Sequence, residues 1–161
     1  MTDTVTTVPN PELDLLLERV VSVRPELVWK AWTTPELMTQ WFTPAPWTTP
    51  VVELDLVPGG KFRTVMQSPE GERSDNTGCI LEVVPNERLV WTGAMDPGFR
   101  PKGELPEVVF TAVISMAPEG EGTRYSALVM HPDPASAKAH DEMGFHEGWG
   151  AVLDQLVEVM S

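Results

Sequence analysis

The sequence predicts an α+β fold in which an antiparallel β-sheet is covered on one face by a long C-terminal helix. Six segments between residues 51 and 130 are rich in apolar and β-branched residues, and turn sequences such as PGG, PNE and APEGEG separate them. Short turns between such segments are typical of an antiparallel meander. From about residue 134 to residue 160, apolar residues recur at helical spacing: Phe145, Trp149, Val152, Leu153, Leu156 and Met160. Because a sheet with one apolar face must be covered, this amphipathic helix is expected to pack on it.

The chain is predicted to form a single domain over residues 13–161. Residues 1–12 are polar and contain prolines, so we expect a flexible N-terminal tail there. LDLLLERVVSV, residues 13–23, predicts a first strand because it is rich in leucine and valine and carries its charges on one side.

Two short helices are expected after the first strand, within RPELVWKAWTTPELMTQWF. Pro25 and Pro35 each suit a first helical turn, and Thr34 is the expected capping residue of the second helix. The following segment, TPAPWTTP at 43–50, has three prolines in eight residues, which excludes regular structure.

The six later strands are expected at VVELDLV, KFRTVMQ, NTGCILEVV, RLVWTGAM, EVVFTAVISM and TRYSALVM. In the second of them, the apolar Phe62 and Met66 alternate with Lys61 and Arg63. This alternation predicts a sheet with one buried face.

Composition narrows the classes of function. A chain of 161 residues suits one domain, and a formal charge of −13 argues against binding to nucleic acid or to an anionic membrane surface. No stretch reaches the roughly 18 apolar residues of a membrane span, and the N-terminus lacks the pattern of a secretory signal. The single cysteine, Cys79, excludes an internal disulfide and is expected to be a buried thiol. We therefore expect a cytoplasmic protein.

Four sequence stretches resemble those of a known superfamily: PELVWKAWTTPELMTQWF, LDLVPGGKFRTVM, GCILEVVPNERLVWT and HEGWGAVLDQL. The chain resembles the START-like (SRPBCC, birch-pollen-allergen-like) superfamily, and within it the family named for the activator of heat-shock protein 90 ATPase. The resemblance implies the helix-grip fold, a curved antiparallel sheet wrapped around the long C-terminal helix, with a cavity for an apolar or amphipathic small molecule. Its members include binding proteins, polyketide cyclases and chaperone regulators, so it implies no single chemistry. The eukaryotic co-chaperones carry a further region, and its absence here weighs against a chaperone role.

HDEMGFHEGWG, residues 140–150, holds two of the three histidines. His140 and His146 are six residues apart, or about 120° around a helix, so they do not ligate one ion on a continuous helix. A site that adds His131 from the preceding strand is the weaker interpretation. We expect no metal and no cofactor.

Glu142 and His146 are four residues apart, so on a helix they share one face, next to the apolar stripe. This pair is the best candidate for polar groups inside the cavity, either as ligand contacts or as an acid–base unit. The alternative is a surface ion pair of little energetic value. His140 is expected on the polar side with Glu147, in solvent.

Gly144, Gly148 and Gly150 each cost a helix about 1 kcal/mol relative to alanine. Close approach of a strand or of a ligand would offset that cost, and strand packing is the favoured explanation.

Aromatic residues and methionines are expected to line the cavity, since methionine adapts its shape to varied apolar ligands. The expected ligand-binding residues are Trp41, Trp47, Phe62, Met66, Trp91, Met95, Phe99, Phe110, Met143, His146 and Trp149. Trp47 and Phe99 fall in long irregular segments, which suggests a lid or a partner surface. Nothing local selects one arginine (Arg63, Arg88, Arg100 or Arg124) as a carboxylate ligand, and the directions of Asp55 and Asp75 are left open.

The leading functional hypothesis is binding of a hydrophobic or amphipathic small molecule between sheet and helix. The first alternative is a metal-free enzyme of the cyclase, dehydratase or hydrolase kind that uses His146 and Glu142. The second is a chaperone-regulator-like interaction module with an exposed apolar patch around Trp47 and Phe99. A small molecule is the expected partner, without nucleic acid or membrane insertion, and a homodimer is left open because symmetric dimers are common.

Overall fold

A computed structural model describes residues 8–106 and 108–161 of the chain. Seven strands form one antiparallel sheet in the order β1-β9-β8-β5-β4-β3-β2. They are β1 (Asp14–Val21), β2 (Thr48–Leu54), β3 (Lys61–Gln67), β4 (Arg73–Val84), β5 (Arg88–Thr92), β8 (Thr111–Glu119) and β9 (Gly122–Met130). β1 pairs with β9, so the first and the last strand along the chain lie side by side in the sheet. The predicted α+β fold and its seven strands are confirmed, but β2 begins at Thr48, so the expectation of no regular structure throughout residues 43–50 is wrong for the last three of them.

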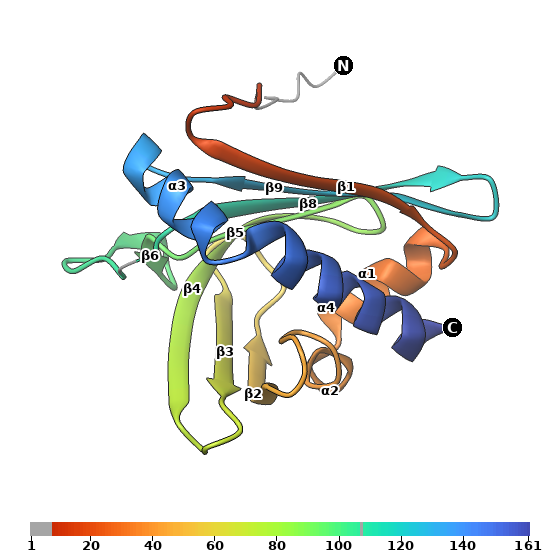
Figure 1. The fold of residues 1–161 in the computed structure, drawn as a ribbon, viewed down its shortest axis with the longest axis horizontal. Helices are drawn as coiled ribbons and strands as arrows, with labels where there is room; N and C mark the ends of the chain where they lie inside the picture. The colour runs from red at the N-terminus through yellow and green to blue at the C-terminus, as the bar shows by residue number, and fades with distance from the viewer. Residues whose placement is uncertain (1–7, 107) are drawn as a thin grey trace.

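The sheet bends around the C-terminal helix, as a helix-grip fold requires. β1, β9 and β8 lie together in one half, while β4, β3 and β2 run almost across them in the other (Figure 1). A register shift between Ile80 and Glu82 lies in the β4–β5 ladder, and such irregularities increase the local bend. The backbones come close here, since a β-carbon at Gly78 would lie 2.4 Å from the carbonyl oxygen of Thr92.

Four helices cover the concave side of the sheet: α1 (Pro25–Thr33), α2 (Pro35–Met38), α3 (Pro134–Glu142) and α4 (Phe145–Met160). The two short helices after the first strand are confirmed, with Pro25 and Pro35 in their first turns. Thr34 takes the N-cap position of α2, although its side chain makes no capping hydrogen bond.

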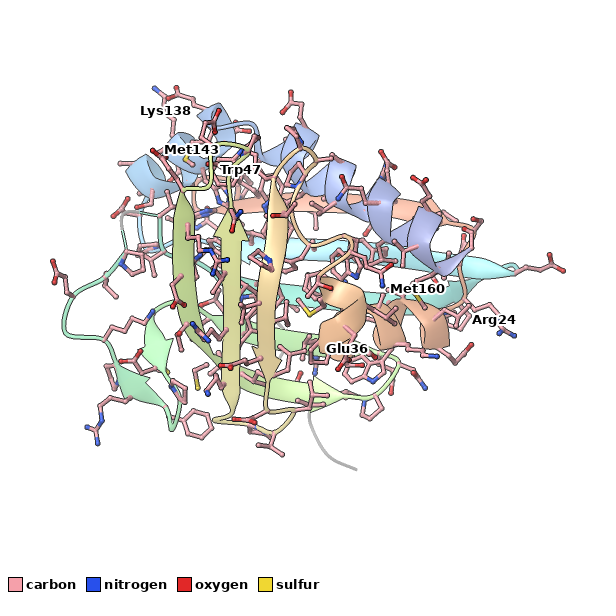
Figure 2. The ribbon with its side chains drawn as sticks, turned by 90° about the horizontal axis from the view of Figure 1, so that it is seen from below. Arg24, Glu36, Trp47, Lys138, Met143 and Met160 are labelled. Carbon is pink, nitrogen blue, oxygen red and sulfur yellow. The ribbon has the colours of Figure 1, made fainter. Side chains whose placement is uncertain are left out.

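The single helix expected from residue 134 to 160 is wrong. Gly144 has φ +92°, a left-handed conformation that ends α3 and precedes α4. Figure 1 shows α3 at one end of the sheet and α4 crossing it towards α1. In Figure 2, Met143 and Lys138 lie at one end of the helical layer, and Met160 and Arg24 lie at the other. The break changes which residues of this region face the sheet.

The core lies between the concave face of the sheet and the helices. Trp32 of α1, Ile80 of β4 and Leu156 of α4 are among its fully buried side chains. Cys79 is buried and free, as predicted. Arg19 of β1 ties α4 to the sheet edge through the Gly150 carbonyl at 3.0 Å and the Asp154 carboxylate at 2.9 Å.

Three further features bear on the sequence predictions. The segment expected to be a long loop after β5 contains a small two-stranded sheet, β6 (Met95–Asp96) with β7 (Arg100–Pro101). Of the predicted N-terminal tail, residues 1–7 lie outside the described residues, and residues 8–12 are exposed. In the described part of the chain, no helix has both the length and the apolar character needed to cross a membrane.

Candidate functional site

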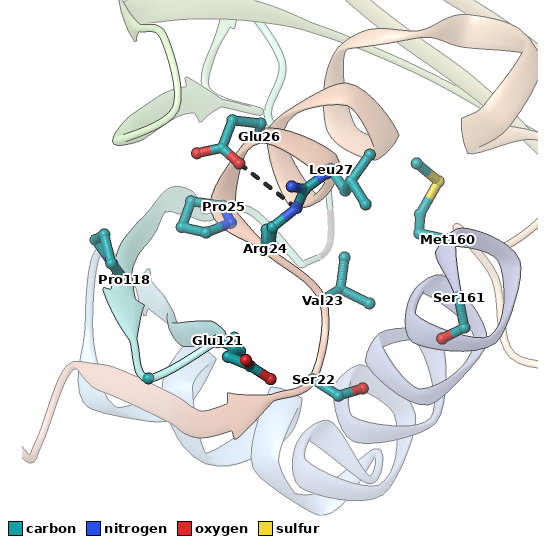
Figure 3. Close-up of a pocket in the computed structure, with 12 residues that line it drawn as sticks. Ser22, Val23, Arg24, Pro25, Glu26, Leu27, Pro118, Glu121, Met160 and Ser161 are labelled. Atoms are coloured by element: carbon teal, nitrogen blue, oxygen red, sulfur yellow. Dashed lines mark ion pairs between the residues drawn. The ribbon is translucent and has the colours of Figure 1, made fainter.

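Two of the hollows in the described surface differ in character. One, of about 690 Å³, lies at the end of α4 near Met160 and Ser161 (Figure 3). Its rim carries a 3.9 Å ion pair between Arg24 and Glu26, whose side chains are both mostly exposed. The other, of about 760 Å³, lies between the sheet and the α3–α4 junction and is lined by buried aromatic rings. The second is therefore the candidate site.

The inner end of this cavity is an aromatic cluster built from α1, β3, β5 and the segment after α2. The rings of Phe62 and Trp91 stack with centroids 4.4 Å apart and planes 8° apart. Trp32 packs edge-on against Trp41 at 4.8 Å and lies 5.2 Å from Trp91. Phe62 pairs across the sheet with Gly78, where a β-carbon would meet the backbone of Thr92. The sequence thus places a cluster of packed aromatic rings at this end of the cavity.

The other end is formed by Phe110, which precedes β8, and by α3 and α4. The ring of His140 stacks on Phe110 at 5.2 Å and 27°, and Phe145 lies edge-on to His140 at 5.3 Å. Trp149 lies 5.8 Å from Phe110 and 5.2 Å from Phe145. This wall is apolar except for the imidazole.

The imidazole of His140 in this wall is paired with a second histidine, His131. Nε2 of His131 lies 2.9 Å from Nδ1 of His140, and Nδ1 of His131 lies 2.8 Å from the carbonyl oxygen of Leu13. The backbone N–H of His131 also donates to that carbonyl, at 3.0 Å. His131 is therefore anchored to the segment before β1, and it anchors His140 in turn. Within the described residues, no group of three potential metal ligands surrounds the pair.

The prediction that His140 lies in solvent is wrong, because only 8% of the residue is exposed and it lines the cavity. The helical spacing that predicts His140 on the polar side treats residues 134–160 as one continuous helix. In α3 alone, Ala137 and His140 form the inward face. Burial and, second, the neighbouring His131 lower the pKa of His140 from 6.5 to about 4, while the carboxylate of Asp141 acts in the opposite direction.

This shift predicts a pH dependence of stability. As the pH falls from about 6.5 towards 4, the unfolded chain binds a proton at residue 140 that the folded chain does not, so the free energy of unfolding decreases across this window. We expect an effect on the order of 1–3 kcal/mol. Urea unfolding at pH 7 and at about pH 4.5 should show a smaller decrease for His140→Phe than for the wild type. His146→Phe, which changes an exposed histidine, should keep the wild-type decrease, and an unchanged decrease in His140→Phe would contradict the assignment.

Polar groups from β4 form the rim. Ser74, Asp75, Asn76 and Thr77 all border the cavity, and Lys102 reaches them from the segment after β7, donating to the Thr77 carbonyl at 2.6 Å. Asp75 is held by both nitrogens of the Arg63 fork at 2.8 and 3.0 Å, which lowers the pKa of its carboxyl group. Arg63 alternates with Phe62 along β3 and lies outside the cavity lining, so the carboxylate of Asp75, whose direction the sequence left open, points to the face of the sheet opposite the cavity.

The structure also places Asp55 and the remaining arginines, whose directions the sequence left undecided. Asp55 is exposed and lies outside the cavity lining. Arg88 pairs with Glu82, Arg124 pairs with Glu18 and Glu119, and Arg100 is exposed. None of these three arginines lines the cavity.

The glycines of α4 leave space where close packing was expected. A β-carbon at Gly148 or at Gly150 would meet no atom within 4 Å. Gly148 lines the cavity and Gly150 does not. The strand-packing explanation is therefore wrong for both, and at Gly148 the helix backbone itself forms part of the cavity wall.

Seven of the eleven expected ligand-binding residues line the cavity: Trp41, Phe62, Met66, Trp91, Phe110, Met143 and Trp149. Trp47, Met95, Phe99 and His146 do not. Trp47 is exposed in its loop, and Met95 pairs with Pro101 in β6. Phe99 has φ +60°, and its ring lies against Gly59, where a β-carbon would be 2.7 Å from Cε2.

Glu142 and His146 do not form the expected inward pair. Both are exposed and lie outside the cavity lining, and Glu142 instead lies 3.9 Å from Lys138. The break at Gly144 puts the two residues in different helices, so their spacing of four no longer places them on one face.

Sequence reasoning missed Trp32, His140 and the polar rim of β4. Trp32 belongs to the buried core and also borders the cavity. The glycine after Met143 was the one signal that could have found His140, because glycine is common just after the end of a helix.

Known proteins are similar to this chain in sequence and in fold. The family model described as Activator of Hsp90 ATPase homolog 1-like protein matches residues 22–161. A comparison with curated proteins gave no match. A crystal structure of a protein from Nitrosomonas europaea is similar at 49% identity and a TM-score of 0.90, over 94% of this chain and 96% of that one.

More distant structures share the fold. A protein from Mycobacterium smegmatis is 23% identical with a TM-score of 0.77, over 98% of this chain and 96% of that one. An AHSA1-like protein from Aeromonas hydrophila is 22% identical with a TM-score of 0.68, over 91% of each chain.

Proposed function

The chain belongs to the family of Activator of Hsp90 ATPase homolog 1-like proteins, and we propose that it binds a flat, amphipathic aromatic molecule in the cavity between sheet and helices. The observation that carries the proposal is a cavity of about 760 Å³ with aromatic walls at both ends and a polar rim. This volume is in the range of small-molecule sites, which are mostly apolar and hold a few placed polar groups.

The shape of the cavity favours a planar ligand. The parallel rings of Phe62 and Trp91 border the cavity, and a flat aromatic ring packs favourably against aromatic walls of this kind. The open space at Gly148 lets a ligand approach the backbone of α4. The rim groups Asn76 and Lys102 can meet the polar end of such a molecule.

The test is calorimetric titration with 2-methoxynaphthalene. We expect saturable 1:1 binding to the wild type and at least a tenfold weaker affinity for Gly148→Phe, because the new ring projects into the cavity. Gly150→Phe is the matched control: it also replaces a glycine of α4 where a β-carbon meets nothing, but it lies outside the cavity and should leave the affinity unchanged. No binding to the wild type, or equal losses in both variants, would refute the proposal.

The enzyme hypothesis and the chaperone hypothesis require different features of the structure. The enzyme hypothesis requires Glu142 and His146 to face one enclosed space, and both are exposed. The chaperone hypothesis expects an apolar patch at Trp47 and Phe99, which are 44% and 48% exposed on separate loops. Neither loop carries a feature specific for a chaperone, so a chaperone partner stays a prediction from the sequence, as does the homodimer.

A further inference from the structure

We propose that His140, positioned by His131, selects the ligand of the cavity: an aromatic molecule with a hydroxyl group that donates a hydrogen bond to Nε2 of His140. The inference rests on the proposed function and specifies the chemistry of the ligand. The starting observation is the hydrogen bond between His131 and His140. The sequence did not predict this bond, and both residues are buried and lie outside any ion pair among the described residues.

The direction of the hydrogen bonds follows from the chain of partners. The Leu13 carbonyl can only accept, so Nδ1 of His131 carries a proton. In a neutral imidazole the other nitrogen is then an acceptor, so Nε2 of His131 accepts from Nδ1–H of His140. His140, neutral in its turn, is left with an unprotonated Nε2. Thus one backbone carbonyl determines the tautomers of both rings.

This nitrogen is free to meet a ligand. Among the described residues, Nδ1 is the only atom of the His140 ring that makes a hydrogen bond to the protein. His140 lines the cavity between the rings of Phe110 and Phe145, which carry no hydrogen-bond donor, and within the described residues the indole of the nearby Trp149 makes no hydrogen bond to it. The nearby charge, Asp141, is exposed on α3. Nε2 is therefore a hydrogen-bond acceptor in an apolar surrounding.

An acceptor in such a place discriminates between ligands. A buried hydroxyl without a partner loses the hydrogen bonds that it makes in water, and a site built to bond a hydroxyl rejects the analogue that lacks it. Ring stacking on Phe110 and Trp149 suits an aromatic carrier for that hydroxyl. A methyl ether, whose oxygen has only lone pairs, gains nothing from Nε2.

The experiment compares 2-naphthol with 2-methoxynaphthalene by calorimetric titration at pH 8, where neutral histidine predominates. For the wild type we expect the naphthol to bind at least tenfold more tightly than the ether. His140→Phe keeps an aromatic ring in this wall but removes the acceptor, so we expect the ratio of the naphthol affinity to the ether affinity to fall to about one. A preference retained in His140→Phe, or absent from the wild type, overturns the inference and leaves the cavity-binding proposal intact.

A second measurement needs no variant. In wild-type protein labelled with nitrogen-15 at histidine, we expect the Nε2 signal of His140 to be that of an unprotonated nitrogen. It should shift when 2-naphthol is added and stay in place with the ether. A protonated Nε2, or equal shifts with both probes, contradicts the inference. If neither probe binds at all, the proposed function fails and the inference fails with it.

Discussion

Trp32→Ala is expected to lower the free energy of unfolding by about 3–5 kcal/mol, the usual cost of removing a large buried aromatic side chain. Trp32 is 2% exposed and packs against Trp41, Trp91 and Phe42 at centroid distances of 4.8, 5.2 and 5.9 Å. Removing it takes away the common neighbour of the other three rings. Because a domain of this size is stable by only about 5–15 kcal/mol, this is a large fraction of the total.

Thermal and urea unfolding measure this change, with an expected fall in melting temperature of about 6–20 °C. Trp32→Phe should cost less than half as much, since a ring remains and the indole N–H that it removes is buried without a hydrogen-bond partner in the described part of the chain. Trp47→Ala is the control for loss of a tryptophan from an exposed loop and should change stability by less than about 0.5 kcal/mol. A similar cost at both tryptophans would refute the assignment of Trp32 as the centre of the cluster.

Gln155→Ala is expected to lower the free energy of unfolding by about 2–3 kcal/mol and to weaken binding of 2-methoxynaphthalene. The side-chain amide of Gln155 donates to the carbonyls of Trp41 and Thr43 at 3.0 and 2.8 Å and accepts from the N–H of Ala45 at 2.9 Å. Each such bond contributes about 1 kcal/mol net, and the loop has no regular structure to replace them. Because Thr43 and Pro44 line the cavity, loosening this loop also loosens its rim.

Urea unfolding and calorimetric titration measure the two effects. Gln40→Ala is the matched control, because Gln40 is exposed and makes a single long bond of 3.4 Å to the Glu36 carbonyl. It should leave both stability and affinity near the wild-type values. If Gln155→Ala behaves like Gln40→Ala, the amide does not hold the loop.

The strands were predictable because their signal is local. In β3, Phe62 and Lys61 alternate with a period of two, and that period alone assigns each side chain to a face of the sheet. The short helices were predictable for the same reason, since Pro25 and Pro35 act on their own first turns. The aromatic lining followed in part, because rings on the buried faces of these elements necessarily point towards the helices.

The faces of the C-terminal region were not predictable from periodicity. A wheel over 134–160 joins two helices that differ in direction, and one residue in a left-handed conformation, Gly144, is enough to put them out of phase. Placing Glu142 and His146 together therefore failed, although the apolar stripe of α4 itself was correct, with Leu153 and Leu156 buried.

The amino-acid sequence by itself determined the α+β class, the order of the elements, the family and the aromatic character of the cavity, because these depend on patterns within each segment. Only the tertiary structure decided that His131 and His140 meet. Their bond joins the residue after β9 to a residue of α3, and its orientation depends on the Leu13 carbonyl beside β1. That acceptor depends on a carbonyl 118 residues from His131 along the chain, and the spacing of the histidines in the sequence contains no information about a hydrogen bond that packing alone creates.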